Sequence, residues 1–126
     1  MTIAYLALVF AILLPVFIAG YAKFSAGFKP RHNRAPRAFL EQQQGVSQRA
    51  RWAEQNTYEA LPAFFAAVVI AHQLQAAQGL VDALAVLFLL LRLAYVVCYV
   101  KDLPTLRSLV WVGGLASTIA LVLIGF

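Results

Sequence analysis

Two arginines, an amide and a carboxylate stand at the head of a long apolar run in the middle of the chain. Arg49 and Arg51 come first, and Asn56 and Glu59 follow three residues apart. On one helix the last two share a face. Glu59 then lies roughly 12 Å past Arg51, at about 1.5 Å per residue. An ionisable residue that deep in a membrane indicates a functional site with a partner.

A second polar stripe lies in a later apolar segment. Arg92, Tyr95 and Tyr99 are spaced i, i+3 and i+7, so one helix presents all three on one face. Arg92 lies roughly 13 Å from the end of its segment, at a depth similar to that of Glu59. We therefore expect Arg92 and Glu59 to pair, or to share a polar ligand. Arg107, which opens the last apolar segment, is expected at the same level.

Together these side chains could line a positively charged cleft that opens to one side of a membrane. Arginine forks bind carboxylates and tyrosine hydroxyls donate hydrogen bonds, so the cleft suits a small anion with amide and carboxylate groups. An arginine beside a thiol would also favour the reactive thiolate. Simpler interpretations stay open: an aromatic belt, arginines that face anionic lipid, and a structural ion pair. No residues have metal-ligand spacing, so we expect no metal site.

The composition is that of a membrane protein. Of the 126 residues, 63% are hydrophobic and 12% are charged, and a soluble domain of this size could not bury so much apolar surface. The net charge of +5 sits between apolar runs, so membrane topology explains it better than nucleic-acid binding does. Cys98 is the only cysteine and lies in a hydrophobic segment, so we expect it to serve packing.

The pattern predicts one all-α domain over residues 1–126, an up-down bundle of four transmembrane helices. The expected spans are 2–22, 48–75, 80–100 and 105–126. Ser47 is expected to cap the second helix and Asp82 the third. A short interfacial helix over 37–44 is also predicted.

Lysine and arginine concentrate in the first polar loop and its helix junction, whereas the middle loop has neither. The first loop, through the start of the next helix, holds Lys23, Lys29, Arg31, Arg34, Arg37, Arg49 and Arg51. The positive-inside rule then places the first and third loops in the cytoplasm and both termini on the non-cytoplasmic side. The first segment lacks a basic start and a small-residue cleavage site, so we expect a retained span and a multi-pass integral membrane protein.

At these residues the chain resembles the MAPEG family, the membrane-associated proteins in eicosanoid and glutathione metabolism, and its bacterial-type members in particular. The family pattern in the second helix is an arginine, three residues, Asn, two residues, Glu and often a nearby Pro. The later pattern is an Arg, an aromatic or His three on, a Tyr four further and an Arg that opens the last helix. The matching residues are Asn56, Glu59, Pro62, Arg92, Tyr95, Tyr99 and Arg107.

The resemblance implies a homotrimer of four-helix subunits, which we expect in the bacterial inner membrane. Glutathione, as co-substrate, would bind between neighbouring subunits near the cytoplasmic face. The residues implied for its binding are Asn56, Glu59, Arg92, Tyr95 and Tyr99, with Arg49, Arg51 and a neighbouring subunit's Lys23 as further candidates. Arg107 would be the catalytic residue that stabilises the thiolate.

Trp52 departs from the family pattern, because it stands where the arginine four residues before Asn56 is expected. Arg51 is one position away, about 100° around a helix. The first interpretation is an enzyme similar to microsomal glutathione transferases, which would conjugate glutathione to a small lipophilic electrophile or reduce a lipid hydroperoxide with it. The alternative is a non-catalytic membrane scaffold that binds another small anion or none. Membrane lipid is an expected partner, and nucleic acid is not.

Overall fold

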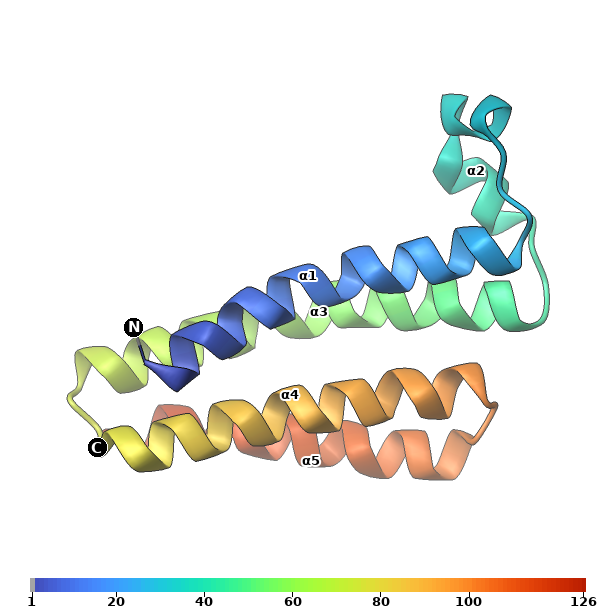
Figure 1. Cartoon of the computed structure of the whole chain (residues 1–126). Coiled ribbons are helices and arrows are strands. Elements are labelled where there is room, and N and C mark those ends of the chain that lie inside the picture. Colours follow the sequence, from blue (N-terminus) through green and yellow to red (C-terminus); the bar gives the residue numbers. More distant parts are fainter. Residues whose placement is uncertain (1) are drawn as a thin grey trace.

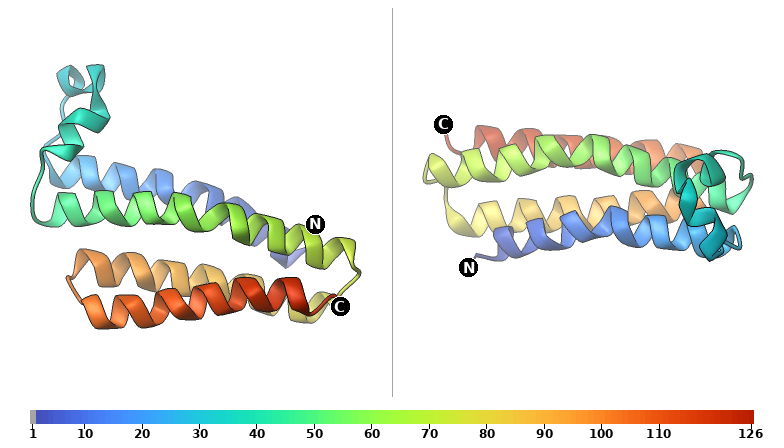
Figure 2. Two further views of the ribbon diagram at one scale, coloured as in Figure 1. Left: turned by 180° about the vertical axis from the view of Figure 1, so that it is seen from behind. Right: turned by 90° about the horizontal axis from the view of Figure 1, so that it is seen from above.

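The computed structural model describes residues 2–126 and contains helices but no strand within that range. Four long helices lie side by side (Figure 1): α1 (Ile3–Ser25), α3 (Val46–Gln73), α4 (Gln78–Val100) and α5 (Pro104–Leu123). A 3-10 helix, η1 (Pro30–Arg34), and the short α2 (Pro36–Glu41) connect α1 to α3. We call residues 29–41 the elbow, because this segment projects sideways from one end of the long helices (Figures 1 and 2). Both termini lie at the opposite end (Figure 1).

Three of the long helices, α1, α4 and α5, are long and apolar enough to cross a membrane. This confirms the all-helical class. The helices α1, α4 and α5 match the ranges predicted over 2–22, 80–100 and 105–126 to within a few residues. The remaining long helix, α3, is more polar in its first half. Its composition alone does not identify it as a membrane-spanning helix. It packs against α1, α4 and α5. The fourth crossing, expected over 48–75, stays a prediction.

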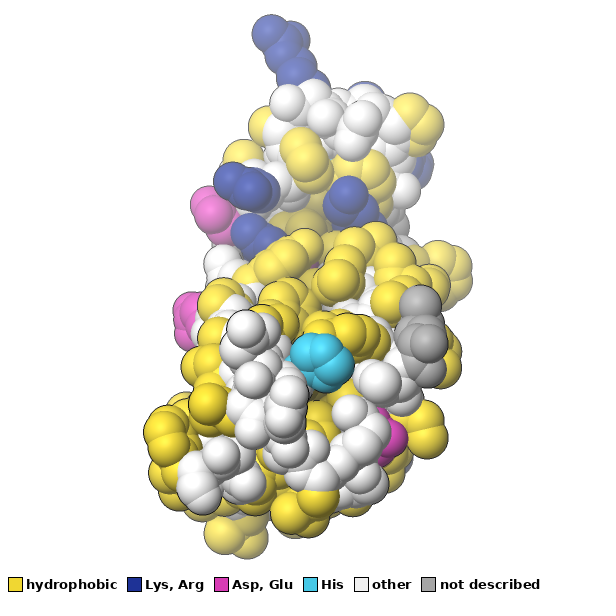
Figure 3. All heavy atoms as spheres, turned by 90° about the vertical axis from the view of Figure 1, so that its left-hand side faces the viewer, with side chains coloured by type: hydrophobic (Ala, Val, Ile, Leu, Met, Phe, Trp, Pro, Cys, Tyr) yellow, Lys and Arg dark blue, Asp and Glu magenta, His cyan; other side chains and the backbone are white. Residues whose placement is uncertain are grey.

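Small residues on α1 and larger ones on the other helices form the core. Ala4, Ala7 and Ala11 are buried along one face of α1, which allows close helix approach. Phe64 of α3 is fully buried and stacks on Phe88 of α4, with ring centroids 3.9 Å apart. Seen from the end that carries the termini, the surface is mostly hydrophobic, and Lys and Arg side chains lie towards the elbow end (Figure 3). This distribution suits helices whose outer faces contact lipid.

The expected cap at Ser47 is wrong, because α3 begins earlier than predicted. Gly45 precedes the helix with a φ of 68°, a left-handed conformation that glycine adopts without strain. Ser47 therefore lies inside the first turn, where it is buried. Its hydroxyl lies 3.2 Å from the hydroxyl of Ser25, at the end of α1, so it joins two helices instead of capping one.

The expected cap at Asp82 is also wrong, because α4 begins at Gln78 and Asp82 lies within it. The Asp82 carboxylate accepts a hydrogen bond from the backbone N–H of Ala4, at 2.9 Å. That N–H belongs to the first turn of α1 and has no partner within its own helix. Asp82 thus satisfies the start of a neighbouring helix. The predicted helix over 37–44 is present as α2, which ends at Glu41.

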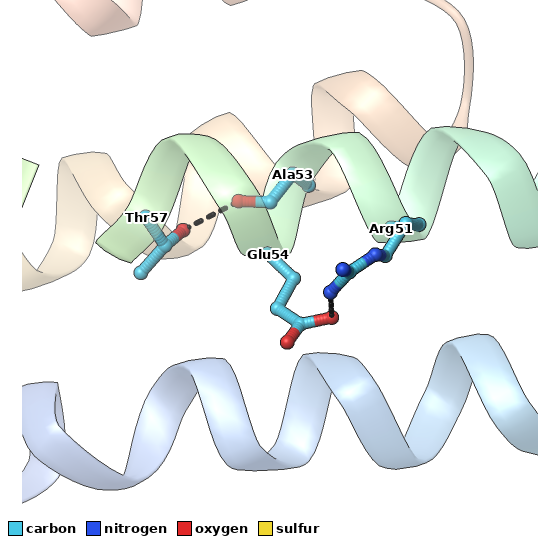
Figure 4. Close-up of polar contacts among 4 residues, drawn as sticks. All are labelled: Arg51, Ala53, Glu54 and Thr57. Atoms are coloured by element: carbon cyan, nitrogen blue, oxygen red, sulfur yellow. Dashed lines mark hydrogen bonds and ion pairs between the residues drawn. The ribbon is translucent and has the colours of Figure 1, made fainter. Parts of the chain in front are cut away.

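A nearly buried ion pair lies between α3 and α1. Arg51 Nη1 donates to Glu54 Oε1 at 3.0 Å, and the two side chains are only 12% and 8% exposed. Figure 4 shows both side chains directed from α3 towards the neighbouring helix α1. This is the only ion pair within residues 2–126. Thr57 is buried on α3, one turn after Ala53. Its hydroxyl donates a hydrogen bond to the carbonyl of Ala53 at 2.7 Å.

We expect Glu54→Ala to lower the free energy of unfolding by about 3 kcal/mol, because it leaves the Arg51 guanidinium nearly buried without a counter-charge. The double variant Arg51→Met/Glu54→Leu should recover most of that loss, because it removes both charges and keeps the volume. Unfolding by dodecyl sulfate in mixed micelles measures both. A Glu54→Ala protein as stable as the parent would contradict the structural role of this pair.

Candidate functional site

A cavity of about 200 Å³ opens between α3, α4 and α5. Its polar wall is formed by Asn56, Glu59, Arg92 and Tyr95. The apolar wall comes mainly from α4 and α5: Phe88, Leu91, Val110, Trp111 and Leu115. A shallower hollow, which we call the groove, adjoins the cavity and shares three of its residues. The groove is lined by Trp52, Gln55, Asn56, Glu59, Tyr95 and Tyr99.

Arg92 is the buried charge of this site, with 5% of its surface exposed. Its Nη2 donates to the Asn56 side-chain oxygen at 2.7 Å. Its guanidinium carbon lies 3.8 Å from the centroid of the Tyr95 ring, one turn further along α4, in a cation–π contact. Its Nε has no hydrogen-bond partner within residues 2–126. One amide and one aromatic face therefore hold a guanidinium inside an otherwise apolar helix.

The expected ion pair between Arg92 and Glu59 is wrong. The residue level with the guanidinium is Asn56, and Glu59 lies about 4.5 Å further along the α3 axis. Glu59 is exposed, lines both the cavity and the groove, and makes no hydrogen bond or ion pair within the described residues. The other expectation, that Arg92 and Glu59 share a ligand, stays a prediction.

The structure brings the predicted tyrosines and the last arginine into one row. Tyr95 packs edge-on against Tyr99, with ring centroids 5.7 Å apart. Arg107 reaches over from α5, and its guanidinium carbon lies 4.5 Å from the centroid of the Tyr99 ring. Because Arg92 stacks on Tyr95 at the other end, the row alternates cation, ring, ring and cation. It runs from the cavity towards the turn between α4 and α5.

Trp52 occupies the place beside Tyr99 that an arginine was expected to fill. It lines the groove, and its ring centroid lies 6.2 Å from that of Tyr99. Arg51, one position earlier, faces α1 in its ion pair with Glu54 and does not line the groove or the cavity. The groove therefore gains an aromatic face and has no cation from this turn of α3.

Arg49 and Lys23, the other two binding candidates, also lie away from the groove. Arg49 Nε donates to the carbonyl of Val100 at 3.2 Å, which fixes the start of α3 to the end of α4. Lys23 lies in the last turn of α1, with its ammonium 4.9 Å from the centroid of the Phe28 ring. Lys23 therefore lines neither the cavity nor the groove of its own chain.

The MAPEG family model matches residues 1–126, which is the whole chain. The chain belongs to the MAPEG family. No curated protein and no solved structure gives a significant match. With three helices apolar enough to span a bilayer, membership in MAPEG indicates an integral membrane protein.

Three residues of this MAPEG chain were missed or given a different role from sequence. Glu54 lies three residues after Arg51, a spacing that favours an ion pair on one helix face, and this signal was present in the sequence. Trp111 was expected to pack or to face the lipid surface. It lies four residues after Arg107, so the two share a face of α5, and it lines the cavity. Gln55 lines the groove beside Asn56, and no sequence signal singled it out.

We expect Asn56→Ala to lower the free energy of unfolding by about 2 kcal/mol, because a buried guanidinium loses its hydrogen-bond acceptor. Glu59→Gln removes a negative charge from the same helix but keeps the size of the side chain, and should change the free energy of unfolding by less than about 0.5 kcal/mol, because Glu59 is exposed. Both values come from the same mixed-micelle unfolding assay. A larger loss for Glu59→Gln than for Asn56→Ala would show that Glu59 is the true partner of Arg92.

Proposed function

We propose that this MAPEG protein binds glutathione in the groove and cavity between α3, α4 and α5. The observation that carries the proposal is the row of two guanidinium groups and two tyrosine rings beside the unpaired carboxylate of Glu59. Glutathione carries two carboxylates, an ammonium group, two amides and a thiol. Arginines and tyrosine hydroxyls donate to carboxylates and amide carbonyls, and Glu59 can accept from the ammonium or an amide N–H.

Arg107 is proposed as the catalytic residue. Its guanidinium is only partly buried and lies over Tyr99 at the edge of the groove, so a thiol bound there would meet a fixed positive charge. A positive charge beside a thiol stabilises the thiolate, which is the nucleophile. In conjugation, the thiol proton passes to solvent, the thiolate sulfur bonds to the electrophilic carbon, and the leaving group on that carbon, such as chloride, departs with its bonding electrons. In the peroxidase variant, the thiolate attacks the terminal oxygen of a lipid hydroperoxide and the O–O bond breaks. The alkoxide takes a proton and leaves as an alcohol, and the sulfenic acid formed on the first glutathione reacts with a second glutathione to give the disulfide and water.

The second substrate is proposed to be small and lipophilic. The cavity is polar on one wall and lined on the other by apolar residues, including Phe88 and Trp111. Exposed apolar side chains on α4 and α5, such as Leu90 and Leu109, would face acyl chains. Lipid could therefore supply the apolar substrate sideways, while glutathione arrives from the aqueous side.

The same proposal includes four crossings and a homotrimer in the bacterial inner membrane, with both termini on the non-cytoplasmic side. Several polar residues of α3 are turned inward: Glu54 and Thr57 are buried, and Asn56 bonds to Arg92 of α4. Mean hydropathy therefore understates how well α3 suits a membrane. In a trimer, a neighbouring copy would cover the exposed side of the groove and bring its own Lys23 to the ligand.

One observation favours the alternative of a non-catalytic scaffold that binds another small anion or none. Trp52 takes the position of an arginine, and both nearby arginines, Arg49 and Arg51, are held by other contacts. The groove is therefore less cationic than the family pattern implies.

Purified protein in neutral detergent separates the two functions. We expect millimolar glutathione to raise the melting temperature, and the protein to conjugate glutathione to chlorodinitrobenzene. Arg107→Ala should lower the turnover number about 100-fold or more, because the thiolate loses its stabilising charge. Arg31→Ala, which removes an exposed arginine of the elbow, is the matched control and should leave turnover unchanged. No effect of glutathione on melting would refute the proposal, and stabilisation without turnover would favour the scaffold.

A further inference from the structure

The elbow concentrates positive charge, with four basic residues against one acidic residue, Glu41, at its end. It holds Lys29, Arg31, Arg34 and Arg37, and no acidic residue occurs from Lys23 through Leu40. All four basic side chains are exposed, and none takes part in an ion pair within residues 2–126. Four cations within nine residues of one another repel, so an anion bound among them would lower the electrostatic energy.

The elbow is fixed to the long helices by its other side chains. Leu40 is buried against Ala22 of α1 and Ala50 of α3. Phe39 stacks on His32, with ring centroids 4.1 Å apart, and so joins α2 to η1. The backbone that carries the basic side chains is therefore packed against α1 and α3. The orientation of these helices in a membrane would set the position of the elbow relative to that membrane.

The elbow lies where a membrane surface would be. It projects sideways from the end of α1, across the direction of the long helices (Figures 1 and 2). If those helices cross the bilayer, the elbow runs along its surface. The last two turns of α1 expose Tyr21 and Phe24, the latter 86% exposed, and exposed aromatic side chains are typical of the interfacial layer. The basic side chains that follow them in the chain would then reach the level of the lipid phosphates.

We propose that the elbow binds the headgroups of anionic phospholipids. Arginine forks match the geometry of phosphate oxygens, and a lysine adds a point charge. Each basic residue near an anionic surface strengthens attachment about fivefold. The elbow shares no residue with the groove or the cavity, so this binding does not depend on glutathione.

The test compares two short-chain lipids on the full-length protein in neutral detergent. Dioctanoyl phosphatidylglycerol is anionic, and dioctanoyl phosphatidylcholine has the same tails without net charge. We expect the protein to bind the anionic lipid at least about tenfold more tightly at low salt, and to lose this preference at high salt. Neutralising the elbow with K29Q, R31Q, R34Q and R37Q together should bring the ratio of dissociation constants close to one.

Two control variants locate the effect. R31K, R34K and R37K together keep the charge and should keep most of the preference. Lys101→Gln removes an exposed cation from the turn between α4 and α5 and should leave the preference intact. If Lys101→Gln abolished it, general surface charge and not the elbow would be responsible.

Four further outcomes would overturn the proposal. The wild type could bind both lipids equally, or the neutralised variant could keep the preference. Glycerol 3-phosphate could bind as tightly as the anionic lipid, which would indicate a site for soluble phosphate compounds. The neutralised variant could lose its oligomeric state at constant lipid, which would show that the elbow contacts another copy of the chain.

Discussion

A guanidinium buried among apolar helices has to find a partner inside the protein, and this requirement shapes the whole site. Removing a charge from water is strongly unfavourable unless hydrogen bonds and nearby dipoles replace the lost hydration. Arg92 meets the requirement with the amide of Asn56 and the face of Tyr95. Because Asn56 belongs to α3 and Arg92 to α4, the bond fixes the two helices in register. Tyr99 then follows one turn later, within reach of Arg107 on α5.

The helix α3 has polar residues on two faces, and each face is used differently. Towards α1, Arg51 and Glu54 of α3 form an ion pair with each other that is nearly closed to solvent. Towards α4 and α5, Asn56 is engaged while Glu59 stays open in the groove. The polar groups on one face therefore pair within α3, and the other face is available to a ligand. Contacts within α3 pair Arg51 with Glu54, and a contact with α4 satisfies the side-chain oxygen of Asn56. A polar helix can lie among apolar ones when its polar groups are paired in this way.

The residues of the row could be predicted from sequence because their geometry lies mostly within one helix. Spacings of three and four residues place Arg92, Tyr95 and Tyr99 on one face whatever surrounds them. The partner of Arg92 could not be predicted this way. Choosing between Asn56 and Glu59 depends on the axial offset between two helices, and no pattern within one segment encodes that offset.

The predictions for the start of α3 and for the direction of the Arg51 side chain also differ from the structure, and each difference has a local cause. Ser47 does not cap α3, because the helix begins two residues earlier than expected, at Val46. Arg51 was expected to reach the groove, but Glu54 competes for it on the side that faces α1. The elbow was predicted only as a basic loop with a short helix. Its support by Leu40 and the stack of Phe39 on His32 come from contacts that are distant in sequence.

The most direct test is the coupling free energy between Asn56 and Arg92 in a double-mutant cycle, measured by unfolding in mixed micelles. If the amide holds the guanidinium, the cycle of Asn56→Ala with Arg92→Met should give about 1.5–3 kcal/mol, as expected for a hydrogen bond to a charged group. The parallel cycle of Glu59 with Arg92 should give close to zero. A coupling below about 0.5 kcal/mol for Asn56, or a larger value for Glu59, would contradict the proposed arrangement of the site.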